Sequence, residues 1–157
     1  MKEYTEEDFR RKAEVYCSKA EHCSSEVREK LRQWGAEPEM AARILVVLQR
    51  NRFVDEIRFC RAFVRDKYRF NQWGRVKIVQ ALRMKQLSSE DIEVGLAEID
   101  EEEYKAVLQT LLAQKAKSIK SGTAYEKNMK LIRFAVGRGF AMSEVLHYVK
   151  QADEFST

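Results

Sequence analysis

Apolar residues at helical spacing recur twice along this chain, about fifty residues later each time. The positions that match after 51 residues are Val27, Leu31, Ala41 and Leu45 with Ile78, Leu82, Ile92 and Leu96. After a further 53 residues the same order returns at Leu131, Ala135, Val145 and Val149. Because residues four apart share one face of a helix, the pattern predicts a helical unit used three times. A repeat array presents a long surface rather than one closed pocket, which favours binding over catalysis.

Helix start signals are frequent in the sequence. A short polar side chain stands three residues before an acidic one at Thr5, Ser88, Asp100 and Thr123. Such a side chain can accept hydrogen bonds from the free backbone N–H groups of a first helical turn. Asp55 and either Ser24 or Ser25 are expected to cap two further helices. Glu37-Pro38 fits the start of another, because proline is tolerated in a first turn.

The stop signals complete nine helices. Gly35 and Gly139 are placed to end two of them, and Lys115–Gly122 is expected to be an extended helix end followed by a loop. The predicted helices are 5–20, 24–35, 38–51, 55–70, 74–86, 89–98, 101–119, 124–138 and 142–152. No segment alternates as a strand would. The prediction is an all-α chain of three tandem three-helix repeats, 1–53, 54–99 and 100–157.

The composition supports a helical, cytoplasmic protein. The chain has 157 residues with only one proline and six glycines, few enough to favour helices. No apolar run approaches the roughly 18 residues of a membrane span, and the acidic N-terminus does not resemble a signal peptide. Three cysteines without a C-x-x-C pattern indicate free thiols in a reducing compartment. Without a heptad seam for a coiled coil, we expect a monomer.

The net charge of +4 conceals a strong segregation. Residues 49–85 carry eleven basic and three acidic groups, and residues 105–140 carry eight basic and one. Between these two blocks, residues 86–104 hold eight acidic groups and no basic one. Basic blocks of this size suit nucleic acid or an acidic protein surface. The plainer interpretation is that lysines and arginines solvate the outer faces of helices.

One stretch and its surroundings carry a resemblance to a known family. Residues 53–64 read FVDEIRFCRAFV, Trp73-Gly74-Arg75-Val76-Lys77-Ile78 follows, and Leu82-Arg83-Met84-Lys85-Gln86 comes next. Together with residues 29–35, EKLRQWG, this order resembles the RecX family of regulatory proteins. Glu56, Cys60 and Gln86 depart from the family pattern, which often has aspartate, alanine and glycine there.

The resemblance implies a fold, a function and a partner. RecX-like proteins are tandem three-helix repeats in an extended, curved, solenoid-like arrangement. They bind the RecA recombinase, especially as a filament on single-stranded DNA, and restrain filament growth, ATP hydrolysis and strand exchange without catalytic residues or a cofactor. The basic blocks of this chain are compatible with contacts to such a filament, or to single- or double-stranded DNA.

The candidate partner- or DNA-binding residues belong to the first basic block: Arg58, Lys67, Arg69, Arg75, Lys77, Arg83 and Lys85. Cations such as Arg75 and Lys77 at a helix start oppose the helix dipole, which raises the interest of that pair. For Arg58, a salt bridge to Asp55 within the helix is an equally good interpretation. Trp34 and Trp73 can stack on bases, but packing beside a helix-terminal glycine is favoured.

Other functions remain as alternatives. A helical nucleic-acid-binding protein acting without a recombinase, or an adaptor for another protein, would use the same surface. Cys17, His22 and Cys23 lack a second ligand pair at zinc-like spacing. No P-loop is present, and nothing assembles a nucleophile, a base and an oxyanion site, so an enzyme is the least favoured class.

Overall fold

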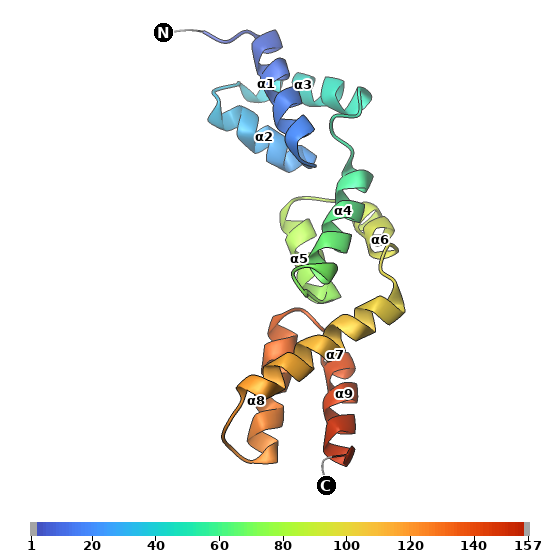
Figure 1. The fold of residues 1–157 in the computed structure, drawn as a ribbon. Helices are drawn as coiled ribbons and strands as arrows, with labels where there is room; N and C mark the ends of the chain where they lie inside the picture. The colour runs from blue at the N-terminus through green and yellow to red at the C-terminus, as the bar shows by residue number, and fades with distance from the viewer. Residues whose placement is uncertain (1–2, 156–157) are drawn as a thin grey trace. The chain divides into compact units, whose positions relative to one another are not determined.

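The computed structural model describes residues 3–155, with side chains as far as Val149. In that range the chain forms nine helices and no strand, which confirms the predicted all-α class (Figure 1). The helices are α1 (Glu6–Lys19), α2 (Ser24–Gln33), α3 (Pro38–Arg50), α4 (Glu56–Arg69), α5 (Arg75–Met84), α6 (Ser89–Leu96), α7 (Glu101–Ser118), α8 (Ala124–Gly137) and α9 (Met142–Phe155). Each predicted helix is present, with ends displaced by at most three residues.

The chain divides into two compact units. Unit 1 comprises Met1–Ala62 and Leu82–Gly95, and unit 2 comprises Phe63–Ala81 and Leu96–Thr157. The division passes through the middle group of helices, so both α4 and α5 contribute to each unit. The three repeat domains 1–53, 54–99 and 100–157 therefore stay a prediction. In unit 1, α1, α2 and α3 pack on one another, and in unit 2 α8 packs on both α7 and α9.

The repeating apolar positions form the core. Eleven of the twelve aligned residues are buried, and Leu96 is half-buried. Burying one such aliphatic side chain contributes roughly 1.5–3 kcal/mol before conformational entropy is counted. Cys60, in place of the family's usual alanine, is fully buried where α4 meets α6. A side chain on Gly95 of α6 would come within 2.9 Å of Cys60, so this helix crossing requires glycine.

The helix starts follow the predicted chemistry, with one exception. Thr5 and Asp8 form a reciprocal capping box, and Asp100 and Thr123 accept the expected backbone hydrogen bonds. The prediction that Ser24 or Ser25 caps α2 is wrong, because the residue preceding the first turn is Cys23. Glu56 accepts the hydrogen bond of the Ser24 N–H at 2.8 Å instead. A carboxylate 32 residues away in the sequence thus satisfies one of the free N–H groups at the start of this helix.

The middle helices of the three groups end alike. Gly35 and Gly139 follow α2 and α8 with positive φ angles of 100° and 101°, as predicted. The corresponding residue after α5 is Gln86, which adopts a φ of 67° without the freedom of glycine. In all three turns, the residue after the left-handed one donates its N–H to the helical carbonyl five residues earlier. The pairs are Ala36 to Leu31, Leu87 to Leu82 and Phe140 to Ala135. This is the hydrogen bond of a Schellman motif.

Each unit contains a joint in which the end of one middle helix meets the start of the preceding one. In the unit 1 joint, the Ser25 hydroxyl donates to the Lys85 carbonyl at 2.6 Å. In the unit 2 joint, the Gly74 N–H donates to the Arg138 carbonyl at 2.8 Å, and the Val76 N–H donates to the Gly139 carbonyl at 3.0 Å. Lys85 and Arg138 stand in equivalent positions of the repeat, so the equivalent carbonyl accepts a hydrogen bond in both joints, from a side chain in one and from the backbone in the other.

Candidate binding surface

The seven predicted basic residues separate into two classes in the structure. Four of them form ion pairs with carboxylates on other segments. These pairs are Arg58 with Glu21 at 2.6 Å, Arg69 with Glu103 at 2.6 Å, Lys85 with Glu26 at 2.9 Å, and Arg75 with Glu101. The other three, Lys67, Lys77 and Arg83, form no ion pair with any residue whose side chain is described.

Arg58 illustrates how tertiary contacts replace a local one. Asp55 does not bind its guanidinium, and accepts the backbone N–H of Arg58 at 3.0 Å, as the predicted helix cap. The guanidinium donates to Glu21 and to the carbonyl of Arg52. The interpretation of a salt bridge between Asp55 and Arg58 is therefore wrong, because the carboxylate is already committed to the first turn of α4.

Arg75 has a structural explanation for its place at a helix start. Its guanidinium lies 4.3 Å from the ring centre of Tyr104 and pairs with Glu101 in the first turn of α7. Glu144 of α9 lies 4.0 Å away. The backbone N–H of Arg75 donates to the Tyr104 hydroxyl at 3.0 Å. Burial of that phenol raises its pKa to about 12, against the lowering effect of this hydrogen bond. These contacts offset the unfavourable helix dipole.

The two candidate cations of unit 2 that form no ion pair lie over one tryptophan. We call Phe63, Lys67, Trp73 and Lys77 the Trp73 cluster. The ammonium groups of Lys67 and Lys77 lie 4.8 and 4.5 Å from the centre of the indole ring. Phe63 meets the ring edge-on at 6.4 Å. The spacing on α4 explains part of this arrangement, because residues 63 and 67 lie one turn apart. The cluster presents two positive charges that no described carboxylate neutralises.

Both tryptophans are engaged in packing. Lys67 and Lys77 lie over the Trp73 ring, and cation–π contacts of this kind contribute roughly 0.5–1 kcal/mol at exposed sites. Trp34 packs against the core of unit 1, with Lys12 4.7 Å from its centre and Tyr16 edge-on at 6.1 Å. Because lysines and neighbouring rings cover these indoles, the structure supports the packing interpretation over base stacking.

The structure also shows the surroundings of His22 and the three cysteines, the residues considered as metal ligands or nucleophiles. His22 stacks on Tyr16 at 3.8 Å and lies 3.3 Å from Glu26. Cys17, Cys23 and Cys60 are free, as their odd count and spacing predicted, and all three are buried. Among the described residues, no three histidine, cysteine, aspartate or glutamate side chains group as metal ligands, and no helix there is long and apolar enough to cross a membrane.

Sequence reasoning found the cations but missed their partners. Glu21, Glu26 and Glu103 lie 37, 59 and 34 residues from the bases that they pair with. No local pattern links residues so far apart. The one relevant feature of the sequence is the stretch 86–104, whose charged residues are all acidic and include Glu101 and Glu103. The structure shows that part of this acidic stretch neutralises the chain's own arginines.

Comparison with known proteins gives a consistent relationship. Residues 55–96 match the family described as "RecX, second three-helix domain". Proteins named "Regulatory protein RecX" are similar over most of the chain. The one from Prosthecochloris aestuarii is 29% identical over 126 residues, which cover 80% of each protein. The one from Ralstonia pickettii is 27% identical over 145 residues, 88% of this chain and 84% of that protein. For Clostridium acetobutylicum, 25% identity extends over 80% of this chain but only 60% of the relative.

Solved structures share the fold. A RecX crystal structure from Lactobacillus salivarius superimposes with a TM-score of 0.83 and 17% identity, covering 96% of this chain and 97% of that one. Another regulatory protein RecX gives a TM-score of 0.81 at 22% identity, over 92% of this chain and 74% of the other. The predicted three-helix architecture is thus found in proteins of that name. The profile match, the relatives and the shared fold together support the assignment of this chain to the RecX family of regulatory proteins.

Proposed function

We propose that this protein is a non-catalytic regulator of homologous recombination that binds the RecA recombinase and its nucleoprotein filament. By docking on the filament it inhibits filament growth, ATP hydrolysis and strand exchange. The observation that carries this proposal is the assignment to the RecX family, supported by similarity over at least 80% of the chain. The charge pattern is compatible, because a filament of protein on DNA offers both acidic and phosphate groups.

The Trp73 cluster and Arg83 are the proposed contacts within the first basic block. Their cations are not neutralised by the chain's described carboxylates, whereas Arg58, Arg69, Arg75 and Lys85 are. A charge that is already paired gains little from a new partner, because binding must first separate the existing pair. The four paired residues therefore contribute mainly to the fold, and the three unpaired ones to binding.

A RecA ATPase assay on single-stranded DNA, titrated with this protein at modest salt, tests the proposal. We expect ATP hydrolysis to fall with low-micromolar protein, and filament assembly measured by light scattering to fall in parallel. An unchanged ATPase rate over that range would rule out the proposed activity. Boiled protein at equal concentration controls for effects of the buffer.

The alternative function is direct nucleic-acid binding without a recombinase. The unpaired cations of unit 2 favour it, because phosphate contacts need accessible positive charge. Binding of a labelled oligonucleotide across a salt series, with and without RecA, discriminates between the two functions. Tight binding that RecA leaves unchanged supports the alternative, and binding that appears only with RecA supports the regulator.

A further inference from the structure

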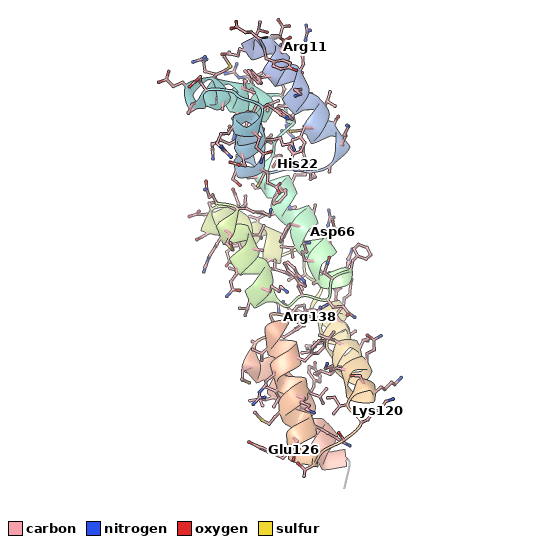
Figure 2. All side chains as sticks on the ribbon, turned by 90° about the vertical axis from the view of Figure 1, so that its left-hand side faces the viewer. Arg11, His22, Asp66, Lys120, Glu126 and Arg138 are labelled. Carbon is pink, nitrogen blue, oxygen red and sulfur yellow. The ribbon has the colours of Figure 1, made fainter. Side chains whose placement is uncertain are left out.

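A second group of cations lies in unit 2, outside the seven residues considered so far. It lines a hollow of about 540 Å³ formed by the end of α7, the loop that follows and the outer face of α8. Four cations contribute to the lining, and we call this set the α7–α8 hollow: Lys115, Lys120, Lys130 and Arg133. Figure 2 shows Lys120 just beyond α7, and Glu126 and Arg138 at the two ends of α8.

The hollow has no internal charge balance. Among the residues whose side chains are described, no carboxylate belongs to its lining, and none of the four cations forms an ion pair. The nearest acid in the sequence, Glu126, extends its side chain toward Gly122 in the loop and is not part of the lining. The negative end of the α7 dipole amounts to roughly half an elementary charge. Four full positive charges outweigh it, so the hollow attracts an anion.

The lining indicates what kind of anion fits. Ser118 and Ser121 add hydroxyls to the cations, and hydroxyl and ammonium groups together are the usual ligands of nucleic-acid phosphates. The apolar members are Ile119 and Phe134. Lys115 and Arg138 lie 4.6 and 5.9 Å from the centre of the Phe134 ring. Only Ile119 and Phe134 of the eight lining residues are apolar, so the hollow offers little to the apolar anchoring side chain that a protein partner typically inserts.

We propose that the α7–α8 hollow binds the phosphodiester backbone of nucleic acid without regard to base sequence. Three lysines and one arginine act mainly as point charges, and the one aromatic ring is already covered by cations, so no group reads a base. The inference goes beyond the proposed RecA regulation, since this contact needs no recombinase, and it names a site for the nucleic-acid binding given above as the alternative.

The test is binding of a fluorescent 30-nucleotide oligothymidylate, followed by anisotropy between 50 and 400 mM salt. The variant Lys120→Gln/Lys130→Gln/Arg133→Gln removes three charges from the hollow. Lys19→Gln/Arg28→Gln/Arg50→Gln removes three exposed charges from unit 1 and is the matched control. Circular dichroism verifies that both variants fold.

The expected result follows from counterion release. For single strands, each lost phosphate contact reduces the magnitude of the slope of log K against log salt by about 0.7. With three charges removed, we expect the slope of the hollow variant to be about 2 smaller in magnitude than that of the wild type. At 0.1 M salt this corresponds to roughly 100-fold weaker binding. The control keeps most of the wild-type slope, and a mixed-sequence oligonucleotide binds as tightly as oligothymidylate.

Three outcomes would overturn the inference. They are equal losses in the two variants, wild-type binding by the hollow variant, and displacement of the oligonucleotide by millimolar inorganic phosphate at matched ionic strength. The last would identify a site for free phosphate. Because the assay contains no recombinase, a negative result does not bear on the proposed regulation of RecA. Equally, a protein without effect in the ATPase assay would not contradict nucleic-acid binding by the hollow.

Discussion

At the scale of single residues, the turn after α5 departs from its two counterparts. Gly35 and Gly139 adopt left-handed backbone angles without a side chain, whereas Gln86 places one there at a φ of 67°. For a residue with a β-carbon, this conformation costs roughly 1–2 kcal/mol. The cost is tolerated because the turn still closes, with the N–H of Leu87 bonded to the carbonyl of Leu82 at 3.2 Å.

We expect the substitution Gln86→Gly to stabilise the protein. Relief of the backbone strain exceeds the extra freedom that glycine gives the unfolded chain, for a net gain of roughly 0.5–1 kcal/mol. Urea denaturation followed by circular dichroism measures the change. Gly35→Ala, at the equivalent turn, should lose about 1 kcal/mol. A lower midpoint for Gln86→Gly would contradict the strain argument.

The buried thiols make a second prediction at this scale. Burial, reinforced by the carboxylates of Asp91 and Glu56, raises the pKa of Cys60 to about 12. Burial likewise raises the pKa of Cys17 to about 11 and also raises that of Cys23. The thiolate is the reactive form, so at pH 8 we expect Ellman's reagent to modify the folded protein at least about 100-fold more slowly than the denatured protein. Rapid modification of any one thiol in the folded protein would show that its burial is not maintained.

At the scale of elements, the unit 2 joint depends on the close approach of two backbones. A β-carbon on Gly74 would lie 2.3 Å from backbone atoms of Gly139 and Phe140, which cannot yield as a flexible side chain would. The same region is held by Arg138, whose guanidinium donates to the carbonyl of Asn71. The close approach of the two backbones therefore occurs where Gly74 also donates a backbone hydrogen bond to Arg138, so a side chain at Gly74 would disturb both.

The substitution Gly74→Ala should destabilise unit 2 by about 3 kcal/mol, the upper range for inserting an atom into a packed site. Gly137→Ala is the matched control, because a β-carbon there meets nothing within 4 Å. The control should be neutral or stabilising by up to about 1 kcal/mol, since alanine favours the helix. Thermal denaturation of both variants compares them, and equal midpoints would contradict the importance of the contact.

The unit 1 joint makes the stability pH-dependent through Glu26. Burial alone would raise its pKa, but hydrogen bonds from Lys85 and from the Cys23 N–H lower it overall. A carboxyl whose pKa is lower in the folded chain stabilises the fold at neutral pH, and that stability is lost as the pH falls. The loss begins near the ordinary glutamate pKa of about 4.3 and continues down to the lower folded value.

We therefore expect Glu26→Gln to be less stable than wild type at pH 7 and to lose less stability between pH 5 and 3. Urea midpoints measured across this range give both quantities. The control is Glu93→Gln, which changes an exposed glutamate in the same unit. Parallel pH profiles for wild type and Glu26→Gln would show that the ion pair with Lys85 does not contribute.

At the scale of the whole molecule, charge is used in two ways. Part of the acidic stretch between the basic blocks neutralises arginines of the chain itself, as Glu103 does for Arg69. The Trp73 cluster and the α7–α8 hollow remain unneutralised by the described side chains. A regulator that binds a charged filament needs such unpaired charge, since rim charges steer association and set its salt dependence.

For the proposed regulator, the double variant Lys67→Gln/Lys77→Gln should weaken inhibition of the RecA ATPase about 10-fold or more in half-inhibitory concentration, the effect of losing roughly 1.4 kcal/mol. Arg65→Gln is the control, because Arg65 is an exposed cation of α4 outside the cluster. The ATPase titration at two salt concentrations measures the effect. Inhibition equal to wild type would remove the cluster from the proposed surface.

The sequence by itself determined the helices, their order and the buried face of each. Capping residues such as Thr5 and Asp100 act within one turn, and apolar residues four apart share a face, so local chemistry is enough. The family resemblance of the middle segment was also readable, because it resides in the order of residues along the chain.

The tertiary structure alone decided which cations pair with a described side chain and which do not. Glu56 caps α2 across 32 residues, and Lys85 meets Glu26 across 59. These pairings arise only when packed helices bring distant charges together, and ion pairs at such separation follow no periodicity. Hence the sequence could name seven basic candidates, but not which of them are paired. The folded chain was needed to separate Lys67, Lys77 and Arg83 from the four cations that form ion pairs within the protein.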